Sequence, residues 1–564
     1  MARTSTKHDH KEPVYINTKD DIQARSIPAN DQTASARAQT SSPNSSVWRQ
    51  LHTGLSIVIL FLNYFLSQYD KFILSYFQDS FSTSLSLNSA QYAVLSGYAT
   101  GIVYALLALP IAYLADYLPK ARVWTLTIAA LWWSLCVVFQ SLSQNFWQVL
   151  LARIGMGVGQ AAVAPLSISL ISDMRGGGSS GSVNSGSAGG SSSIPGRRIL
   201  AVFMGSSVFY VGVYVGEAVS GQIATAFTAT QSGWRVALRA IGVAGIVMAV
   251  VLRLVLREPS RKISLVQQRL LVDDQDGKAD TAKTEGLAGR NIGVSKMSAA
   301  RVELMGTVSY VVRLRSFWLL VLSASFRQLS GNVFGYYMPS YLSNTYSSHP
   351  ELLSRYGIIV GVVGSVSVLS GGLLTALLWN RTKLTPIYLT GIGGMISSIF
   401  VLMMIFSCDI ASGSEDRGIT ILYGTMAAAY LTAETWLGCL EMLIALLLPP
   451  RYKTFGLAIW ESVQVLVYSS GPEIIGLALR NEDSGSAEYT KVTQIALAVI
   501  IPLGYWIAGI GFLSAIPLLK RDLRSDFVVD RLSARRRMGV ASFMAMLGAF
   551  VVALFVASII YAAA

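Results

Sequence analysis

Residues 146–172 read FWQVLLARIGMGVGQAAVAPLSISLIS, a run of 27 residues in which Arg153 is the only charged side chain. A helix needs about 20 predominantly apolar residues to cross the hydrocarbon core of a bilayer. This run therefore predicts a membrane-spanning helix. An arginine at membrane depth costs roughly 2.5–3.5 kcal/mol or more unless it faces a partner or a wet cavity, so Arg153 also marks a candidate functional position.

Similar apolar runs lie on both sides of this one. With 146–172 they form two sets, 54–77, 91–115, 122–141, 199–227 and 234–256 in the first and 316–343, 353–379, 385–408, 418–448, 454–479 and 493–519 in the second. Six spans in each set predict an all-α, polytopic membrane protein of two six-helix bundles. Another apolar run, about 539–563, predicts an additional C-terminal transmembrane helix.

The polar segments between these runs complete the predicted domain organisation. We expect a disordered tail at 1–50, an N-terminal bundle at 51–256 with a Gly/Ser-rich loop at 176–193, a central loop at 257–315, a C-terminal bundle at 316–520, a basic linker at 521–537 and the additional helix at 538–564. Lys and Arg gather in the tail and in alternate loops. By the positive-inside rule, this predicts a cytosolic N-terminus.

Composition excludes other classes of protein. Only 13% of the residues are charged, whereas soluble proteins carry about 25%, and 52% are hydrophobic. The net charge of +13 resides in the loops, so it orients a membrane protein and does not form a face for nucleic acid. The three cysteines, Cys136, Cys408 and Cys439, have no partner at metal-ligand spacing, and we expect no cofactor.

The last apolar run carries an alanine at every fourth position. These are Ala541, Ala545, Ala549, Ala553 and Ala557. Small residues at this spacing allow close approach of helices. We expect this helix to pack against the bundle, and a homodimer formed through it is the alternative.

Polar and ionisable residues inside the spans are the candidate site. The substrate-binding or coupling candidates are Asp70, Lys71, Arg153, Gln160, Glu217, Arg327, Asn332, Tyr336, Glu434 and Glu461. Asp70 and Arg153 fall at the same depth of antiparallel spans, which predicts a close pair that is either a switch or a static ion pair. Arg327 facing Glu and Gln side chains suits an amphiphilic or anionic substrate, or forms an internal pair with Glu434.

Two sets of motifs resemble a known family. Residues 112–122, AYLADYLPKAR, are similar to the loop motif of major facilitator proteins, although Ala112, Tyr117 and Pro119 depart from its pattern. In that family the motif latches the cytosolic side, with the aspartate capping a helix. The resemblance therefore implies a gating role for Asp116, Lys120 and Arg122.

The closest likeness within the superfamily is to spinster-like transporters. It is carried by Asp70-Lys71-Phe72, Arg153-Ile-Gly-Met-Gly-Val-Gly-Gln160, Gly233-Trp234-Arg235, Pro449-Pro450-Arg451 and Gly471-Pro472-Glu473. The resemblance implies a carrier of lysolipids, sphingoid phosphates or similar amphiphiles in an endosomal, lysosomal or plasma membrane, with several members proton-linked. Here Lys71 replaces an arginine and Gln160 a glutamate, so proton coupling is absent or is moved to Asp70 or Glu217.

The predicted function is transport of a small-molecule substrate across the bilayer by alternating access. A transporter of sugars or organic anions and a transport-inactive sensor of the same fold are the alternatives. A membrane-embedded enzyme would need a nucleophile with a base, or a metal cluster, at membrane depth. The four histidines, His8, His10, His52 and His349, lie in the tail, at a helix edge or in a loop, so we expect no catalytic residue and no metal site.

Overall fold

The computed structural model describes residues 43–118, 120–176, 196–227, 233–259, 308, 310–448, 453–480, 482, 486–523 and 534–563. Most of the predicted tail, Gly/Ser-rich loop, central loop and basic linker lies outside these residues. The chain divides into two units, residues 1–52 and 53–564. The described part of the first unit is the start of helix α2, and the second unit holds every other helix.

The described residues form helices and no strand, which confirms the all-α prediction. The first half contains α2 (Pro43–Tyr76), α3 (Gln78–Leu85), α4 (Ser89–Ser96), α5 (Tyr98–Tyr117), α6 (Ala121–Leu142), α7 (Phe146–Gln160), α8 (Val163–Gly176), α9 (Gly196–Phe227) and α10 (Gly233–Val255). α2 begins at Pro43, inside the range expected to be tail. Proline is favoured in the first turn of a helix because its missing N–H has no intrahelical partner there.

The second half repeats this pattern of long and broken helices. It contains α13 (Arg315–Thr345), α14 (Leu352–Ile359), η1 (Val360–Gly364), α15 (Ser365–Leu378), α16 (Thr385–Ile405), α17 (Ser407–Ile410), α18 (Glu415–Ala433), η2 (Glu434–Trp436), α19 (Cys439–Leu447), α20 (Lys453–Tyr468), α21 (Ser470–Ala478) and α22 (Ala487–Asp522), followed by α23 (Ala534–Ala563). All twelve predicted apolar runs are therefore helical.

Ten helical stretches among the described residues are long and apolar enough to cross a membrane. The two predicted spans that miss this standard are α13 and the pair α20–α21. α13 carries Arg327 and Asn332 within its length, and α20 carries Glu461. The least apolar helices of the bundle are thus the ones that supply several of the candidate site residues.

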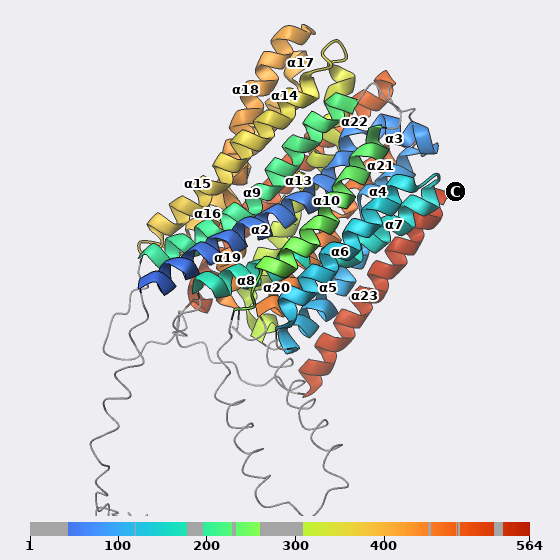
Figure 1. The fold of residues 1–564 in the computed structure, drawn as a ribbon. Coiled ribbons are helices and arrows are strands. Elements are labelled where there is room, and N and C mark those ends of the chain that lie inside the picture. The colour runs from blue at the N-terminus through green and yellow to red at the C-terminus, as the bar shows by residue number, and fades with distance from the viewer. Residues whose placement is uncertain are drawn as a thin grey trace, which may run out of the picture. The chain divides into compact units, whose positions relative to one another are not determined.

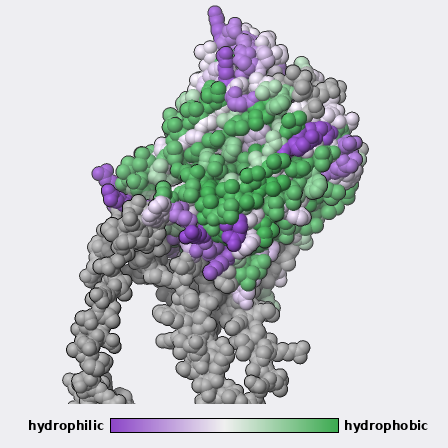
Figure 2. Space-filling model, viewed as in Figure 1, coloured by the Kyte–Doolittle hydropathy of each residue, from purple (hydrophilic) through white to green (hydrophobic). Residues whose placement is uncertain are grey.

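The outer surface of the bundle is apolar. Figure 2 shows a broad hydrophobic area with hydrophilic residues gathered toward its ends. The exposed side chains include Trp124, Ile128, Leu131, Trp132, Leu135 and Phe139 on α6, and Val243, Val247, Val250 and Leu254 on α10. These positions recur every three or four residues, as expected for one helix face in contact with lipid.

Three glycines of α7 allow neighbouring helices to approach closely. A Cβ at Gly155 would lie 2.8 Å from the Cys136 sulfur of α6, and one at Gly157 would lie 2.5 Å from the Thr100 carbonyl oxygen of α5. A Cβ at Gly159 would meet backbone and side-chain atoms of α6 at 2.8–2.9 Å. The glycines therefore fix α7 against two neighbouring helices.

The two halves contact each other through several pairs of helices (Figure 1). α9 packs against α14 and α15, α5 packs against α20, and α4 packs against α21. At the last of these contacts, Gly476 lies directly against Ala93. Every pair joins one helix of the first half to one of the second, so the residues between them face both halves.

The additional helix α23 packs against α4 and α5 of the same chain. Tyr561 also lies under the Arg480 guanidinium, at 4.4 Å. This packing agrees with the expectation that the helix lies against the bundle. Ala549, Ala553 and Ala557 are exposed, whereas Ile559, Tyr561 and Ala562 pack on the bundle. The homodimer through this helix stays a prediction.

The close packing of α7 gives a stability prediction. Gly159→Ala should lower the melting temperature of the purified protein by several degrees, because overpacking a close contact costs about 1–3 kcal/mol. Gly424→Ala is the matched control, since Gly424 is a helical glycine with no neighbour within 4 Å. The control should melt at the original temperature or higher, because alanine favours helix. Equal melting temperatures for the two variants would contradict this packing.

Candidate functional site

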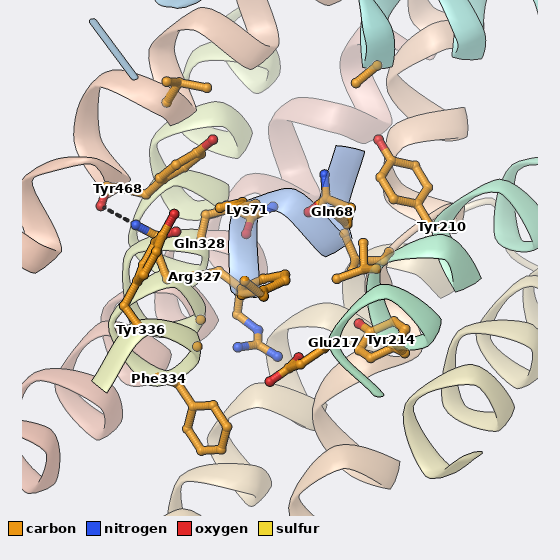
Figure 3. Close-up of a pocket in the computed structure, with 18 of the residues that line it drawn as sticks. Gln68, Lys71, Tyr210, Tyr214, Glu217, Arg327, Gln328, Phe334, Tyr336 and Tyr468 are labelled. Atoms are coloured by element: carbon orange, nitrogen blue, oxygen red, sulfur yellow. Dashed lines mark hydrogen bonds between the residues drawn. The ribbon is translucent and has the colours of Figure 1, made fainter. Parts of the chain in front are cut away.

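A cavity lies between the two halves. Its walls include parts of α2, α4, α5, α7, α8 and α9 of the first half and of α13, α16, α18, η2, α19, α20 and α22 of the second. Figure 3 shows Lys71, Glu217 and Arg327 around this space, together with the tyrosines Tyr210, Tyr214, Tyr336 and Tyr468. The cavity is thus polar, aromatic and charged in the middle of an apolar bundle.

Most of the predicted site residues line this cavity. They are Lys71, Gln160, Glu217, Arg327, Asn332, Tyr336, Glu434 and Glu461. The two other candidates, Asp70 and Arg153, are buried, at 0% and 1% exposed, but do not line it. The structure therefore divides the candidates into those that line the cavity and two, Asp70 and Arg153, that are buried in the first half outside its lining.

Arg327 and Glu434 form the internal ion pair that the sequence left open. Arg327 Nη2 lies 3.3 Å from Glu434 Oε1 and donates to the Ala433 carbonyl oxygen at 2.9 Å. The guanidinium stacks over the Tyr505 ring at 3.9 Å. Glu434 Oε2 also accepts hydrogen bonds from the hydroxyl of Tyr214, at 2.6 Å, and from the indole of Trp436. Tyr214 belongs to the other half, so this network joins the halves across the cavity.

The chain breaks at Glu434 in a way that positions this carboxylate. α18 ends at Ala433, and a single 3₁₀ turn, Glu434–Trp436, follows it. Gly438 then adopts a φ of +80°, a backbone conformation that residues with a Cβ rarely reach. The turn exposes the Ala433 carbonyl to Arg327 and directs Glu434 toward the cavity.

Lys71 is a cation without a close carboxylate. Its Nζ lies 4.9 Å from the Tyr468 ring centroid and 5.4 Å from that of Phe72. Glu461 and Glu217 interact with it electrostatically. Among the described residues, however, no carboxylate oxygen lies within 4.0 Å of this ammonium. The positive charge of Lys71 is therefore not neutralised by a close carboxylate and faces the groups that line the cavity.

Three further polar contacts hold the cavity wall. Gln160 Nε2 donates to the Ser67 carbonyl oxygen at 3.5 Å, and Asn332 Nδ2 to that of Tyr468 at 3.3 Å. The Tyr356 hydroxyl donates to Glu217 at 3.4 Å, which joins the two halves again. These contacts are long for hydrogen bonds, so little free energy holds the side chains in place.

The predicted close pair of Asp70 and Arg153 does not form. Both oxygens of Asp70 are buried without a hydrogen-bond partner. Arg153 Nη1 instead donates to the Leu95 carbonyl oxygen at 2.9 Å. Leu95 lies in the last turn of α4, where carbonyl groups have no intrahelical partner because the helix ends at Gly97. That carbonyl competes with the carboxylate for the arginine.

At one end of the bundle, charged side chains form a network between the halves, which we name the latch. Its members are Asp116, Arg122, Ser169, Ser172, Asp173, Glu258, Lys453 and Thr454. Arg122 binds Asp173 at 2.7 Å and Glu258 at 2.5 Å, and Lys453 of the second half binds Asp173 at 3.1 Å. Asp173 therefore accepts from both halves at once.

Asp116 has the helix-capping role that the resemblance implied. Its Oδ2 accepts a hydrogen bond at 2.9 Å from the backbone N–H of Phe455, in the first turn of α20. A carboxylate at a helix N-terminus satisfies a free N–H and stabilises the helix dipole. Among the described residues, no hydrogen bond or ion pair joins Lys120 to the latch in this conformation. Lys120 is exposed at a left-handed turn before α6, and within the described chain Lys453 bridges the halves instead.

The sequence missed the aromatic part of the cavity wall. Tyr64, Tyr104, Tyr210, Tyr214 and Tyr505 all line it. They come from α2, α5, α9 and α22, and nothing in their spacing along the chain marks them as neighbours. The only available signal was the number of tyrosines, 25, in so apolar a chain.

These features define a multi-pass helical membrane protein whose halves enclose a charged cavity, the architecture of a solute transporter. The model of the Major Facilitator Superfamily matches residues 60–472. The chain therefore belongs to the major facilitator superfamily.

Individual relatives are distant. An MFS-type efflux pump of Mycolicibacterium smegmatis is 21% identical over 450 residues, which cover 79% of this chain and 90% of that protein. The crystal structure of a bacterial homologue of the human lysosomal transporter Spinster, inward-facing and unoccupied, matches with a TM-score of 0.54 at 19% identity over 86% of this chain and 99% of the other. A D-xylose–proton symporter matches with a TM-score of 0.52 at 16% identity over 84% and 99%. These likenesses show the fold.

The Arg327–Glu434 pair gives a prediction that uses a double-mutant cycle. Arg327→Met should lower the melting temperature strongly, because breaking a buried ion pair costs about 3–5 kcal/mol by leaving a charge uncompensated. Adding Glu434→Gln to that variant should recover at least half of the loss, since the uncompensated charge is then removed. Additive losses in the double variant would show that the two residues are not coupled.

Proposed function

We propose that this protein is a secondary active or facilitative transporter that works by alternating access. Its substrate is a small amphiphilic organic solute such as a lysolipid or a sphingoid phosphate. The observation that carries the proposal is a cavity whose charged lining comes from both halves and is buried in an otherwise apolar bundle. In a transporter of this kind the halves rock around such a site and expose it to each side in turn.

The latch supports a defined conformation for this structure. It joins α5, α6 and α8 of the first half to the start of α20 in the second. We assign this end to the cytosol, in line with the Lys and Arg bias of the sequence, which also places the N-terminus there. Rocking toward an inward-open state would break Lys453–Asp173 and Asp116–Phe455.

In a proton-coupled transporter, a side chain of the cavity or its surroundings must bind the proton, and few residues here can do so. Gln160 carries an amide, which takes up no proton at physiological pH. Asp70 is a carboxyl group of the first half whose two buried oxygens have no hydrogen-bond donor in this conformation. A bare charge there is costly, so we propose that Asp70 carries a proton in this state and gains Arg153 as its partner in another.

The lipid-like substrate is favoured over a sugar by the lining. Tyrosine rings and charged side chains together suit an amphiphile with an apolar part and a charged headgroup, whereas a sugar carries no charge for these side chains to bind. The xylose symporter shares the fold, and carriers of sugars or organic anions remain the second candidate. The branch of the superfamily that we propose is the spinster-like one, in endosomal, lysosomal or plasma membranes. We propose no enzymatic activity.

Asp70 and Arg153 provide the first test of this function. Asp70→Asn and Arg153→Met should each reduce lysolipid transport in proteoliposomes at least tenfold, with normal membrane insertion. Lys491→Met is the control, because Lys491 is exposed on α22, away from the cavity. Transport at the original rate in both Asp70→Asn and Arg153→Met would remove these residues from the mechanism.

The latch gives an independent prediction. Lys453→Met combined with Asp173→Asn removes the charge-assisted hydrogen bond between the two residues, worth about 1.5–3 kcal/mol, so the latch end should open roughly tenfold to a hundredfold more often. A cysteine placed at Ala164, in the cavity wall, should then react several-fold faster with a membrane-impermeant maleimide added from that side. Lys120→Met is the control and should leave the rate unchanged. An unchanged rate in the latch variant would contradict the gating role.

A further inference from the structure

The part of the cavity nearest the latch contains two carboxyl groups that the latch and the Arg327 network do not use. Glu441 lies on α19 and Glu461 on α20, eight residues and about two turns beyond Lys453. Glu441 is 2% exposed and accepts a hydrogen bond from the indole of Trp460 at 2.8 Å. The two carboxyl groups interact with each other electrostatically.

The charges of the cavity do not balance. Its lining contains four carboxyl groups, from Glu217, Glu434, Glu441 and Glu461, and two cations, Lys71 and Arg327. Ionised together they give a net charge of −2. Arg327 is paired with Glu434, which leaves Lys71 alone against the other three carboxyl groups. Within the described chain, neither Glu441 nor Glu461 has a Lys or Arg nitrogen within 4.0 Å.

Four tyrosines surround these two carboxyl groups. Tyr64, Tyr104 and Tyr210 belong to the first half and Tyr468 to the second, and all four line the cavity. The hydroxyls of the first three interact electrostatically with both carboxyl groups. We name this group, with Glu441 and Glu461, the acid–tyrosine box.

One group in the box lacks a partner. Tyr210 is 3% exposed, and its buried hydroxyl has no hydrogen-bond partner. Its ring packs edge-on against Tyr64, with centroids 5.5 Å apart. The Tyr468 ring already holds one ammonium, that of Lys71, at 4.9 Å. The box therefore combines uncompensated acid, an unsatisfied hydroxyl and aromatic rings suited to a cation.

We propose that the acid–tyrosine box binds an organic ammonium group, the cationic part of the amphiphilic substrate. Aromatic faces and carboxylates together are the groups that recognise alkylated ammonium ions in proteins. A desolvated ammonium would balance the excess negative charge, which a purely anionic solute would increase. This inference rests on the proposed transport function and narrows its substrate to amines, quaternary ammonium compounds or zwitterions.

The position of the box links binding to conformation. The carboxyl groups belong to the second half, and three of the four tyrosines belong to the first. An ammonium between them contacts both halves beside the latch. It therefore stabilises the conformation in which the latch is closed.

The test compares two probes that differ only in charge. One is lysophosphatidylcholine, and the other is its isostere in which a 3,3-dimethylbutyl group replaces choline, with carbon in place of nitrogen. Binding of each is measured by scintillation proximity on the full-length protein in lipid nanodiscs, with a radiolabelled acyl chain. We expect the choline form to bind at least tenfold more tightly, and Glu441→Gln with Glu461→Gln to reduce this preference to about twofold or less.

The controls separate the box from the rest of the protein. Glu488→Gln, on an exposed turn of α22, should keep the full preference. Tyr210→Phe keeps the ring and should retain most of it. If the original protein binds both probes equally, the inference is overturned while the transport proposal stands. The inference is also overturned, and the transport proposal still stands, if Glu441→Gln with Glu461→Gln keeps the full preference for the choline form. A change in the pH dependence of binding alone has the same consequence. Binding of neither probe overturns the inference and the lysolipid form of the proposed function together.

Discussion

The free-energy cost of placing charge and unpaired backbone in hydrocarbon governs this structure. An ionised side chain facing lipid at the centre of a bilayer is expensive, and so is a backbone N–H or C=O without a partner. The lipid-facing sides of α6 and α10 therefore carry tryptophan and aliphatic residues. The buried charges, such as Asp70, Arg153 and Arg327, lie inside the bundle.

The same constraint explains where the helices break. Non-helical backbone is tolerated at membrane depth only where protein buries it or a cavity solvates it. α4 breaks from α5 at Gly97, α18 from α19 across Glu434–Gly438, and α20 from α21 at Ser469. Gly97, Glu434 and Ser469 all line the cavity. The freed groups are used there, as the Ala433 carbonyl is by Arg327.

The sequence predicted the helices well because their signal is local. Twenty apolar residues in a row need no knowledge of tertiary contacts, and polar residues within them point inward for the same energetic reason. Eight of the ten substrate-binding or coupling candidates accordingly line the cavity. The direct Asp70–Arg153 pair failed because its competitor is a backbone carbonyl, Leu95, which only a helix break makes available. Lys453 and the tyrosines were missed because their neighbours are distant in sequence.

One rigid element connects the two functional regions. α20 is a continuous helix of 16 residues. Its first turn carries Lys453 and Phe455 of the latch, and farther along it carries Glu461 and Tyr468 of the cavity wall. A continuous hydrogen-bonded helix moves as a unit, because bending it sharply would require a proline, a bulge or an inserted group. Any shift of the cavity wall on α20 therefore displaces the latch residues with it, and release of the latch moves Glu461 relative to the tyrosines of the first half. In the alternating access that we propose, the stiffness of this one helix would couple the chemistry of the cavity to the opening of the bundle.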